Sequence, residues 1–96
     1  MQPELLSQEE IDRALRTELP RWTQQEDAIV RSVEAPTFLD GIALVRQVAE
    51  VAEDLNHHPD IDIRWTTVTF TLSTHSVGGI TMQDLRLAGD IDRLAG

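Results

Sequence analysis

The chain has 96 residues and no cysteine, and its formal net charge is −9 because 17 acidic residues outnumber eight basic ones, all of them arginine. This length predicts a single domain over residues 1–96, and the lack of cysteine excludes disulfides and thiolate zinc sites. The negative charge argues against binding to nucleic acid or to anionic membranes.

Cellular location and self-association follow from the same features. Residues 1–12 contain several acidic side chains and no long apolar run, so no signal peptide is expected. No segment approaches the length of a transmembrane helix. A small secreted domain usually carries disulfides, so a chain without cysteine is expected in the cytoplasm. A domain of this size buries only part of its surface, which favours self-association.

The first predicted helix starts at a capping box. Ser7 and Glu10 have the Ser-x-x-Glu spacing in which each side chain bonds to the backbone of the other. Pro20 disfavours helical geometry at the residue before it, so the helix is expected to end at Leu19. Residues 22–34 then predict two short strands joined by a turn near Glu26-Asp27.

The second predicted helix covers about residues 37–56 and has two apolar stripes at helical spacing. Either the helix is buried by its own domain, or one stripe packs on the sheet while the other meets a second copy of the chain. The second interpretation is favoured, because few residues remain to cover both stripes. The first stripe is Phe38, Ile42, Val45, Ala49 and Ala52, and the second is Leu44, Val48, Val51 and Leu55.

The last part of the chain changes period and then returns to a helix. Within residues 63–74, apolar side chains alternate with threonine and serine, which predicts one long half-buried strand or a strand pair. Gly78-Gly79 predicts a tight turn. Thr81 and Asp84 resemble a second capping box at the start of a last helix. The sequence therefore predicts an α+β fold, with a small antiparallel sheet of three to four strands and three helices packed on one face.

All three histidines lie at junctions between these elements. His57-His58 follows the second helix and precedes Pro59, which must end that helix before the pair, and His75 follows the long strand. One cleft could hold all three imidazoles if the helix end and the strand end are neighbours. Imidazoles titrate near neutral pH, so one could donate a proton while another accepts one.

Nearby polar residues could assist such a cluster. Glu53 and Asp84 could orient imidazoles by hydrogen bonding, and Thr74 and Ser76 could bind the polar edge of a ligand.

Simpler interpretations of the same residues exist. A His-His-Pro sequence can be a solvated helix end. Histidine and carboxylate also suit a metal ion, but adjacent residues of an extended chain point apart, so His57 and His58 form a poor chelating pair. Trp22 and Trp65 could stack on a flat ligand, although a tryptophan in a small domain is more often part of the core.

Several short segments together form a signature with many parts. They are Glu53-Asp54-Leu55-Asn56-His57-His58-Pro59, Trp65-Thr66-Thr67-Val68, Leu72-Ser73-Thr74-His75, Gly78-Gly79-Ile80-Thr81 and Asp84. In order and spacing they resemble the pterin-4a-carbinolamine dehydratases. The resemblance covers essentially the whole chain, and such a signature is more specific than any one of its pieces.

The resemblance implies an activity and a set of site residues. A 4a-hydroxytetrahydropterin would lose water to give a quinonoid dihydropterin, with no metal or organic cofactor. His57, His58 and His75 would be the acid–base groups, without an assignment of acid and base. The pterin site would be lined by Pro59, Thr74, Ser76 and Val77, with Glu53 and Asp84 supporting the histidines.

The chain also departs from the family pattern, and a second role remains open. Ile61 replaces a frequent aromatic residue, which could loosen stacking at the pocket rim, and Ile42 and Val45 replace phenylalanines in the second helix. The alternative role is a non-enzymatic dimerisation or assembly factor on the same fold, which the wide apolar arc of the second helix would also suit. The intact histidine set favours catalysis. A homodimer or homotetramer through the second helix is expected in either case.

Overall fold

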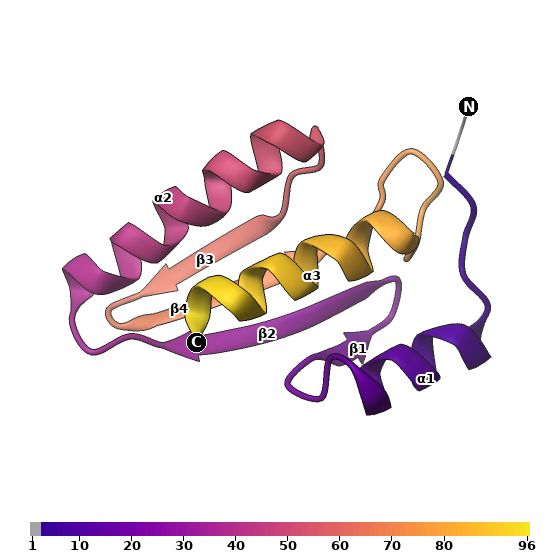
Figure 1. The fold of residues 1–96 in the computed structure, drawn as a ribbon, viewed down its shortest axis with the longest axis horizontal. Coiled ribbons are helices and arrows are strands. Elements are labelled where there is room, and N and C mark those ends of the chain that lie inside the picture. Colours follow the sequence, from indigo (N-terminus) through magenta and orange to yellow (C-terminus); the bar gives the residue numbers. More distant parts are fainter. Residues whose placement is uncertain (1–2) are drawn as a thin grey trace.

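The computed structural model describes residues 3–96, which form three helices and one four-stranded antiparallel sheet (Figure 1). The strands lie in the order β1-β2-β4-β3. This architecture confirms the predicted α+β class. In chain order the elements are α1 (Gln8–Thr17), β1 (Thr23–Gln25), β2 (Ala28–Glu34), α2 (Phe38–Leu55), β3 (Asp60–Arg64), β4 (Thr67–Leu72) and α3 (Met82–Ala95).

One face of β4, which is one of the two inner strands of the sheet, is buried. Val68, Phe70 and Leu72 are fully buried, and the threonines between them are half-buried on the opposite face. On β2, Ile29 pairs with Leu72 and is itself fully buried. The predicted period of two is confirmed, because alternate side chains of a strand point to opposite faces of the sheet.

Residues 63–74 adopt the second of the two predicted arrangements, a strand pair. β3 and β4 form a hairpin whose turn contains Trp65 and Thr66, and β3 starts at Asp60, earlier than expected. Trp65 has a φ of 52° and is 80% exposed, so the expectation of a core position is wrong for this tryptophan. Hydroxyl groups of Thr67 and Thr66 donate to Glu34 and hold the pKa of its carboxyl below the ordinary value.

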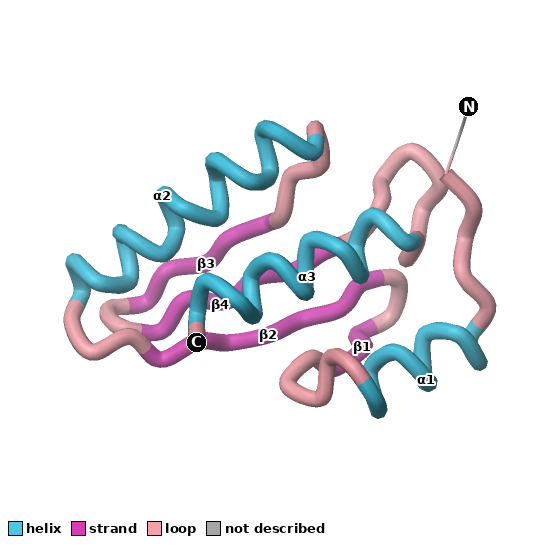
Figure 2. The backbone as a smooth tube through the Cα atoms, viewed as in Figure 1, coloured by secondary structure: helices cyan, strands magenta, loops and turns pink. Residues whose placement is uncertain are grey.

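α2 and α3 run antiparallel to each other across the same face of the sheet (Figures 1 and 2). The second stripe of α2 packs against the core, with Leu44 and Val48 buried, while Phe38 and Ile42 of the first stripe are exposed. Ala52 is buried together with the second stripe, contrary to its predicted place in the first. Within residues 3–96, no helix is long and apolar enough to cross a membrane.

α1 starts at the predicted capping box. The Ser7 hydroxyl accepts from the Glu10 amide at 3.1 Å, and the Glu10 carboxylate accepts from the Ser7 amide at 2.9 Å. These bonds hold the pKa of Glu10 below its ordinary value. The box therefore stabilises the fold above the ordinary carboxyl pKa and loses that contribution as the pH falls through the lowered one. The helix ends at Thr17, before the predicted Leu19.

A partly buried ion pair joins β2 to α3. Arg31 is 7% exposed, and its Nη1 donates to Oδ1 of Asp92 at 2.5 Å. The same oxygen accepts from Nε1 of Trp22 at 2.8 Å. Trp22 is thus a core residue, as expected, with its polar atom satisfied by the last helix.

Candidate functional site

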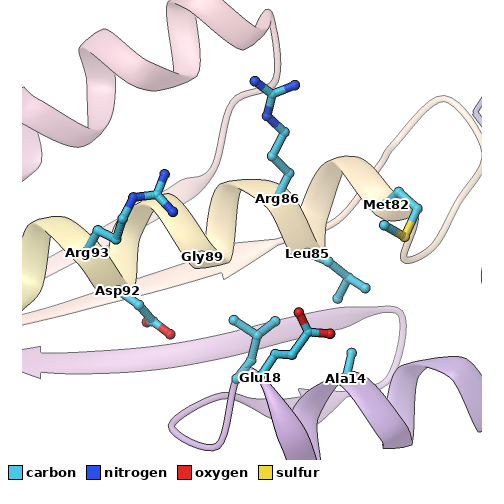
Figure 3. Close-up of a pocket in the computed structure, with 9 residues that line it drawn as sticks. Ala14, Glu18, Met82, Leu85, Arg86, Gly89, Asp92 and Arg93 are labelled. Carbon is cyan, nitrogen blue, oxygen red and sulfur yellow. The ribbon is translucent and has the colours of Figure 1, made fainter.

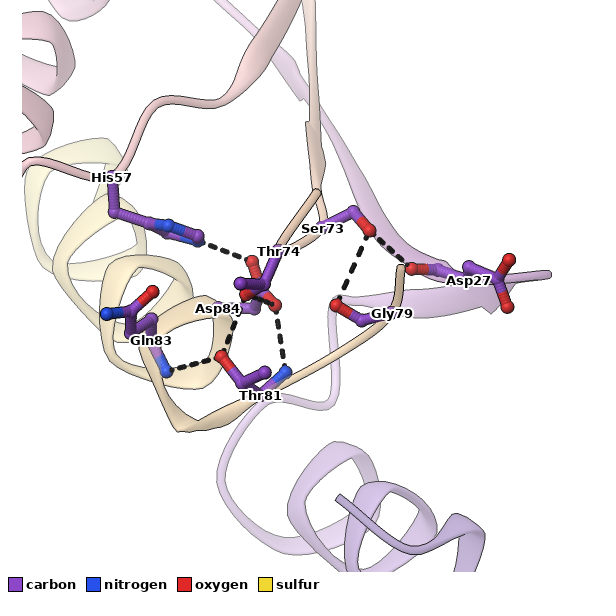
Figure 4. Close-up of polar contacts among 8 residues, drawn as sticks. All are labelled: Asp27, His57, Ser73, Thr74, Gly79, Thr81, Gln83 and Asp84. Atoms are coloured by element: carbon purple, nitrogen blue, oxygen red, sulfur yellow. Dashed lines mark hydrogen bonds and ion pairs between the residues drawn. The ribbon is translucent and has the colours of Figure 1, made fainter. Parts of the chain in front are cut away.

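Three chain segments meet where the predicted site residues lie. α2 ends at Leu55, and its C-cap Asn56 adopts the left-handed conformation with φ 50° and ψ 45°. This reverses the chain, and the His57 amide donates back to the Ala52 carbonyl at 3.0 Å. The helix therefore ends before the histidine pair, as predicted. Figure 4 shows that His57 then points toward the segment after β4 and the first turn of α3.

The turn after β4 is closed by backbone bonds. The Thr74 amide donates to the Gly79 carbonyl at 2.8 Å, and the Gly78 amide donates to the Thr74 carbonyl at 2.9 Å. Gly78 has a φ of 72°, a conformation that glycine adopts without strain. The turn thereby brings Thr74 next to the N-terminus of α3.

His57 and Asp84 form the central pair of the site. His57 is buried and Asp84 is fully buried, and Nε2 of the imidazole lies 2.6 Å from Oδ1 of the carboxylate. A buried carboxylate is costly unless it is fully hydrogen-bonded. The pair joins the end of α2 to the start of α3, across 27 residues of sequence.

The second oxygen of Asp84 has two further donors. Oδ2 accepts from the Thr74 hydroxyl at 2.8 Å and from the Thr81 amide at 2.9 Å. The hydroxyls of Thr74 and Thr81 lie 2.8 Å apart, and the Gln83 amide donates to the Thr81 hydroxyl at 3.2 Å (Figure 4). Asp84 therefore caps α3, as its spacing from Thr81 predicts, and also holds His57.

His58 has a different acidic partner. Its Nε2 is hydrogen-bonded to Oε2 of Glu53, one turn earlier on α2, and both side chains are more than half exposed. Glu53, which was predicted to support a histidine, is thus hydrogen-bonded to His58. An exposed pair of this kind orients an imidazole but contributes little to stability.

His75 lies in the exposed turn between β4 and α3. Its imidazole makes no hydrogen bond within residues 3–96, and the adjacent Ser76 is exposed as well. Val77 and Pro59 are half-buried. The structure brings His57, Asp84 and Thr74 into one hydrogen-bonded network and leaves His58 and His75 outside it. The Thr74 hydroxyl, predicted to lie at the ligand, is bonded to Asp84 and Thr81.

A small cavity opens beside His57. It has a volume of about 100 Å³ and is lined by Leu55, His57, Gln83 and Arg86. Ligand pockets are usually larger than this. Gln83 and Arg86 were not predicted from the sequence. The signal for them is their place on the first turns of the helix that carries Asp84.

A larger pocket of about 380 Å³ lies between α1 and α3 and includes none of the predicted site residues. Figure 3 shows Glu18 and Leu85 between the two helices, whereas Arg86 and Arg93 point away from α1. Arg86 lines both this pocket and the cavity at His57. Within residues 3–96, no three histidine, aspartate or glutamate side chains come together in a way that could hold a metal ion.

Comparison with known proteins gives consistent matches over nearly the full chain. The sequence model of the family described as pterin 4 alpha carbinolamine dehydratase matches residues 4–94. A protein of Nocardia farcinica named "Putative pterin-4-alpha-carbinolamine dehydratase" is 60% identical over 95 residues, which is 99% of each chain. A protein of the same name from Mycolicibacterium smegmatis is 56% identical over 90 residues, or 94% of this chain and 95% of the relative.

Two solved structures share the fold. The crystal structure of a transcriptional coactivator/pterin dehydratase from Brucella melitensis superimposes with a TM-score of 0.92 and 34% identity, over 97% of this chain and 100% of the other. A pterin dehydratase-like protein described as a RuBisCO assembly factor in the α-carboxysome has a TM-score of 0.64, covering 79% of this chain and 88% of its own. At 22% identity the second likeness shows the fold alone.

Proposed function

Because the chain belongs to the pterin-4α-carbinolamine dehydratase family, we propose that it is a hydro-lyase that dehydrates a 4a-hydroxytetrahydropterin to a quinonoid dihydropterin. The observation that carries the proposal is the buried pair of His57 and Asp84 beside a cavity, in a chain that keeps all three family histidines. An imidazole oriented by a carboxylate is the usual arrangement for proton transfer near neutral pH. The cysteine-free sequence supports a cytoplasmic location.

The reaction requires one proton acceptor and one proton donor. The N5–H bond of the pterin breaks, and its electron pair forms the N5=C4a double bond. The C4a–O bond breaks at the same time, and the leaving hydroxyl takes a proton and departs as water. His57, His58 and His75 supply the acceptor and the donor, and exchange with solvent returns the protein to its starting state.

The remaining predicted residues receive more specific roles in this proposal. Pro59, Ser76 and Val77 flank the histidines and bind the pterin. Glu53 orients His58, to which it is hydrogen-bonded. Thr74 supports Asp84 instead of contacting the substrate, because its hydroxyl is buried between Asp84 and Thr81.

We expect the purified protein to accelerate dehydration of a synthetic 4a-hydroxytetrahydropterin. The rate is measured in a stopped-flow spectrophotometer from the absorbance of the quinonoid product, against buffer at the same pH as the blank. Bovine serum albumin at equal concentration serves as the control for non-specific protein catalysis. A rate equal to that of buffer would refute the enzymatic proposal and leave the interaction role in its place.

The exposed stripe of α2 supports an interaction role beside catalysis. Phe38, Leu39 and Ile42 are large, apolar and exposed on the first turns of this helix. We propose that copies of the chain associate through this face as a dimer or tetramer. A contiguous apolar face of this kind usually marks a contact between proteins.

Light scattering at micromolar concentration is expected to give the mass of a dimer or tetramer for the wild type. Ile42→Glu is expected to give a monomer, because association would bury its charge against apolar side chains. Met82→Glu, which places the same charge at an exposed apolar residue of α3, is the matched control and should keep the wild-type mass. A monomeric wild type would contradict the proposal.

A further inference from the structure

The hydrogen bonds that converge on Asp84 have a defined direction. The Thr81 hydroxyl accepts from the Gln83 amide, which leaves its own hydrogen for the Thr74 hydroxyl. The Thr74 hydrogen then goes to Oδ2 of Asp84, since an ionised carboxylate can only accept. The Thr81 amide points to the same oxygen. Figure 4 draws this chain of bonds as dashed lines. Each of its donors therefore points toward the carboxylate of Asp84.

Because an ionised carboxylate can only accept, Asp84 also determines which nitrogen of His57 carries a hydrogen. Oδ1 of Asp84 faces Nε2 of His57, so Nε2 must be the donor and the lone pair of the neutral imidazole lies on Nδ1. Nδ1 has no hydrogen-bond partner within residues 3–96. Over the same residues, no buried side-chain nitrogen or oxygen lacks a partner. Nδ1 is therefore not fully buried, on a residue that lines the small cavity.

We propose that Thr74 and Thr81 are positioning residues that hold His57 in the Nε2–H tautomer, and that His57 is thereby the base of the reaction. Nδ1 takes the proton from N5 of the pterin, while the electron pair of the N5–H bond forms the N5=C4a double bond. The C4a–O bond breaks, and the leaving hydroxyl receives its proton from the acid, which is His58 or His75. The identity of the substrate rests on the proposed dehydratase function, but the tautomer does not.

The sharpest test is Asp84→Asn. Two donors, the Thr74 hydroxyl and the Thr81 amide, point at the Oδ2 position, so the amide oxygen of asparagine should occupy it. Its NH₂ group then faces His57, whose Nε2 must accept. The hydrogen of the neutral imidazole moves to Nδ1, which can no longer act as a base. The cap of α3 is kept, because the Thr81 amide still meets an oxygen.

The tautomer is read directly by ¹⁵N–¹H NMR correlation of the imidazole nitrogens in the full chain, with the His57 signals assigned by their loss in His57→Gln. We expect the Nε2–H form in the wild type and the Nδ1–H form in Asp84→Asn. We also expect kcat of Asp84→Asn to fall by about 10²- to 10⁴-fold, the usual contribution of a general base. A wild type with the hydrogen on Nδ1, or an asparagine variant with an unchanged tautomer, would overturn the inference.

Thr74 is tested by a pair of substitutions. Thr74→Val removes the hydroxyl that holds Oδ2, so we expect kcat to fall by about tenfold or more with KM unchanged, and Thr74→Ser to restore it. Thr69→Val, which removes a half-buried threonine hydroxyl from the opposite face of β4, is the matched control and should keep wild-type activity. Wild-type kcat in Thr74→Val would refute the positioning role.

The two proposals fail in different ways. If the wild type has the Nε2–H tautomer and Asp84→Asn the other, but neither protein dehydrates the pterin, the proposed function is wrong and the tautomer assignment stands. If the wild type is active with the hydrogen of His57 on Nδ1, the function stands and the base is another histidine.

Discussion

Replacing His75 with alanine is expected to lower kcat for pterin dehydration by about 10²- to 10⁴-fold while leaving the fold unchanged. The side chain is exposed and makes no hydrogen bond within residues 3–96, so its removal leaves no buried group without a partner. The whole effect should therefore fall on proton transfer. Stopped-flow assay of the variant measures the loss, and thermal unfolding followed by circular dichroism checks the fold.

A second substitution separates proton transfer from polarity at this position. His75→Gln keeps a polar side chain but cannot exchange a proton near neutral pH, so it should be as slow as the alanine variant. A glutamine variant with wild-type kcat would show that His75 binds the substrate without acting as acid or base. An alanine variant with wild-type kcat would remove His75 from the mechanism and leave His58 as the acid.

Replacing Asp92 with alanine is expected to lower the free energy of unfolding by about 3–5 kcal/mol. The substitution leaves the guanidinium of Arg31 buried without its anion, and it also removes the acceptor of the Trp22 indole. An uncompensated buried charge is one of the few single changes with so large an effect. Urea unfolding at a fixed protomer concentration measures the difference, since association adds to apparent stability.

Asp90→Ala provides the matched control on the same helix. Asp90 also pairs with an arginine, Arg93, but the Arg93 side chain is largely exposed, and such pairs contribute about 0–1 kcal/mol. If both substitutions lowered the free energy of unfolding equally, the burial of Arg31 would not be the cause of the effect.

The local features of the fold could be predicted because their causes lie within a few residues. Both capping boxes, at Ser7 and at Thr81, form as their spacing indicates, and the alternation in β4 places its apolar side chains in the core. The end of α2 before His57 was also predicted. Its cause is the left-handed cap at Asn56 together with Pro59, not the proline alone.

Features that depend on distant parts of the chain could not be predicted in the same way. Arg31 and Asp92 are separated by 61 residues, and nothing local to either indicates the other. Trp65 was expected in the core because tryptophans of small domains are more often buried, but the turn between β3 and β4 places it in solvent. The bond between Thr74 and Asp84 likewise appears only once the turn after β4 places Thr74 next to the N-terminus of α3.

The family resemblance predicted that the three histidines are the acid–base groups, but it did not distinguish their roles. His57 is held by a buried carboxylate, His58 by an exposed one, and His75 by neither. These three environments follow from the distances between elements, which a single sequence does not contain. They suggest that the three imidazoles are not interchangeable.

Asp84 performs two tasks with one carboxylate, since it caps α3 through the Thr81 amide and holds His57 through its other oxygen. The first turn of α3 and the orientation of the imidazole therefore depend on the same side chain. Unravelling of that turn would therefore also release the imidazole of His57. Asp84→Asn, which keeps an oxygen facing the Thr81 amide, should separate these two tasks, whereas loss of the whole side chain would remove both.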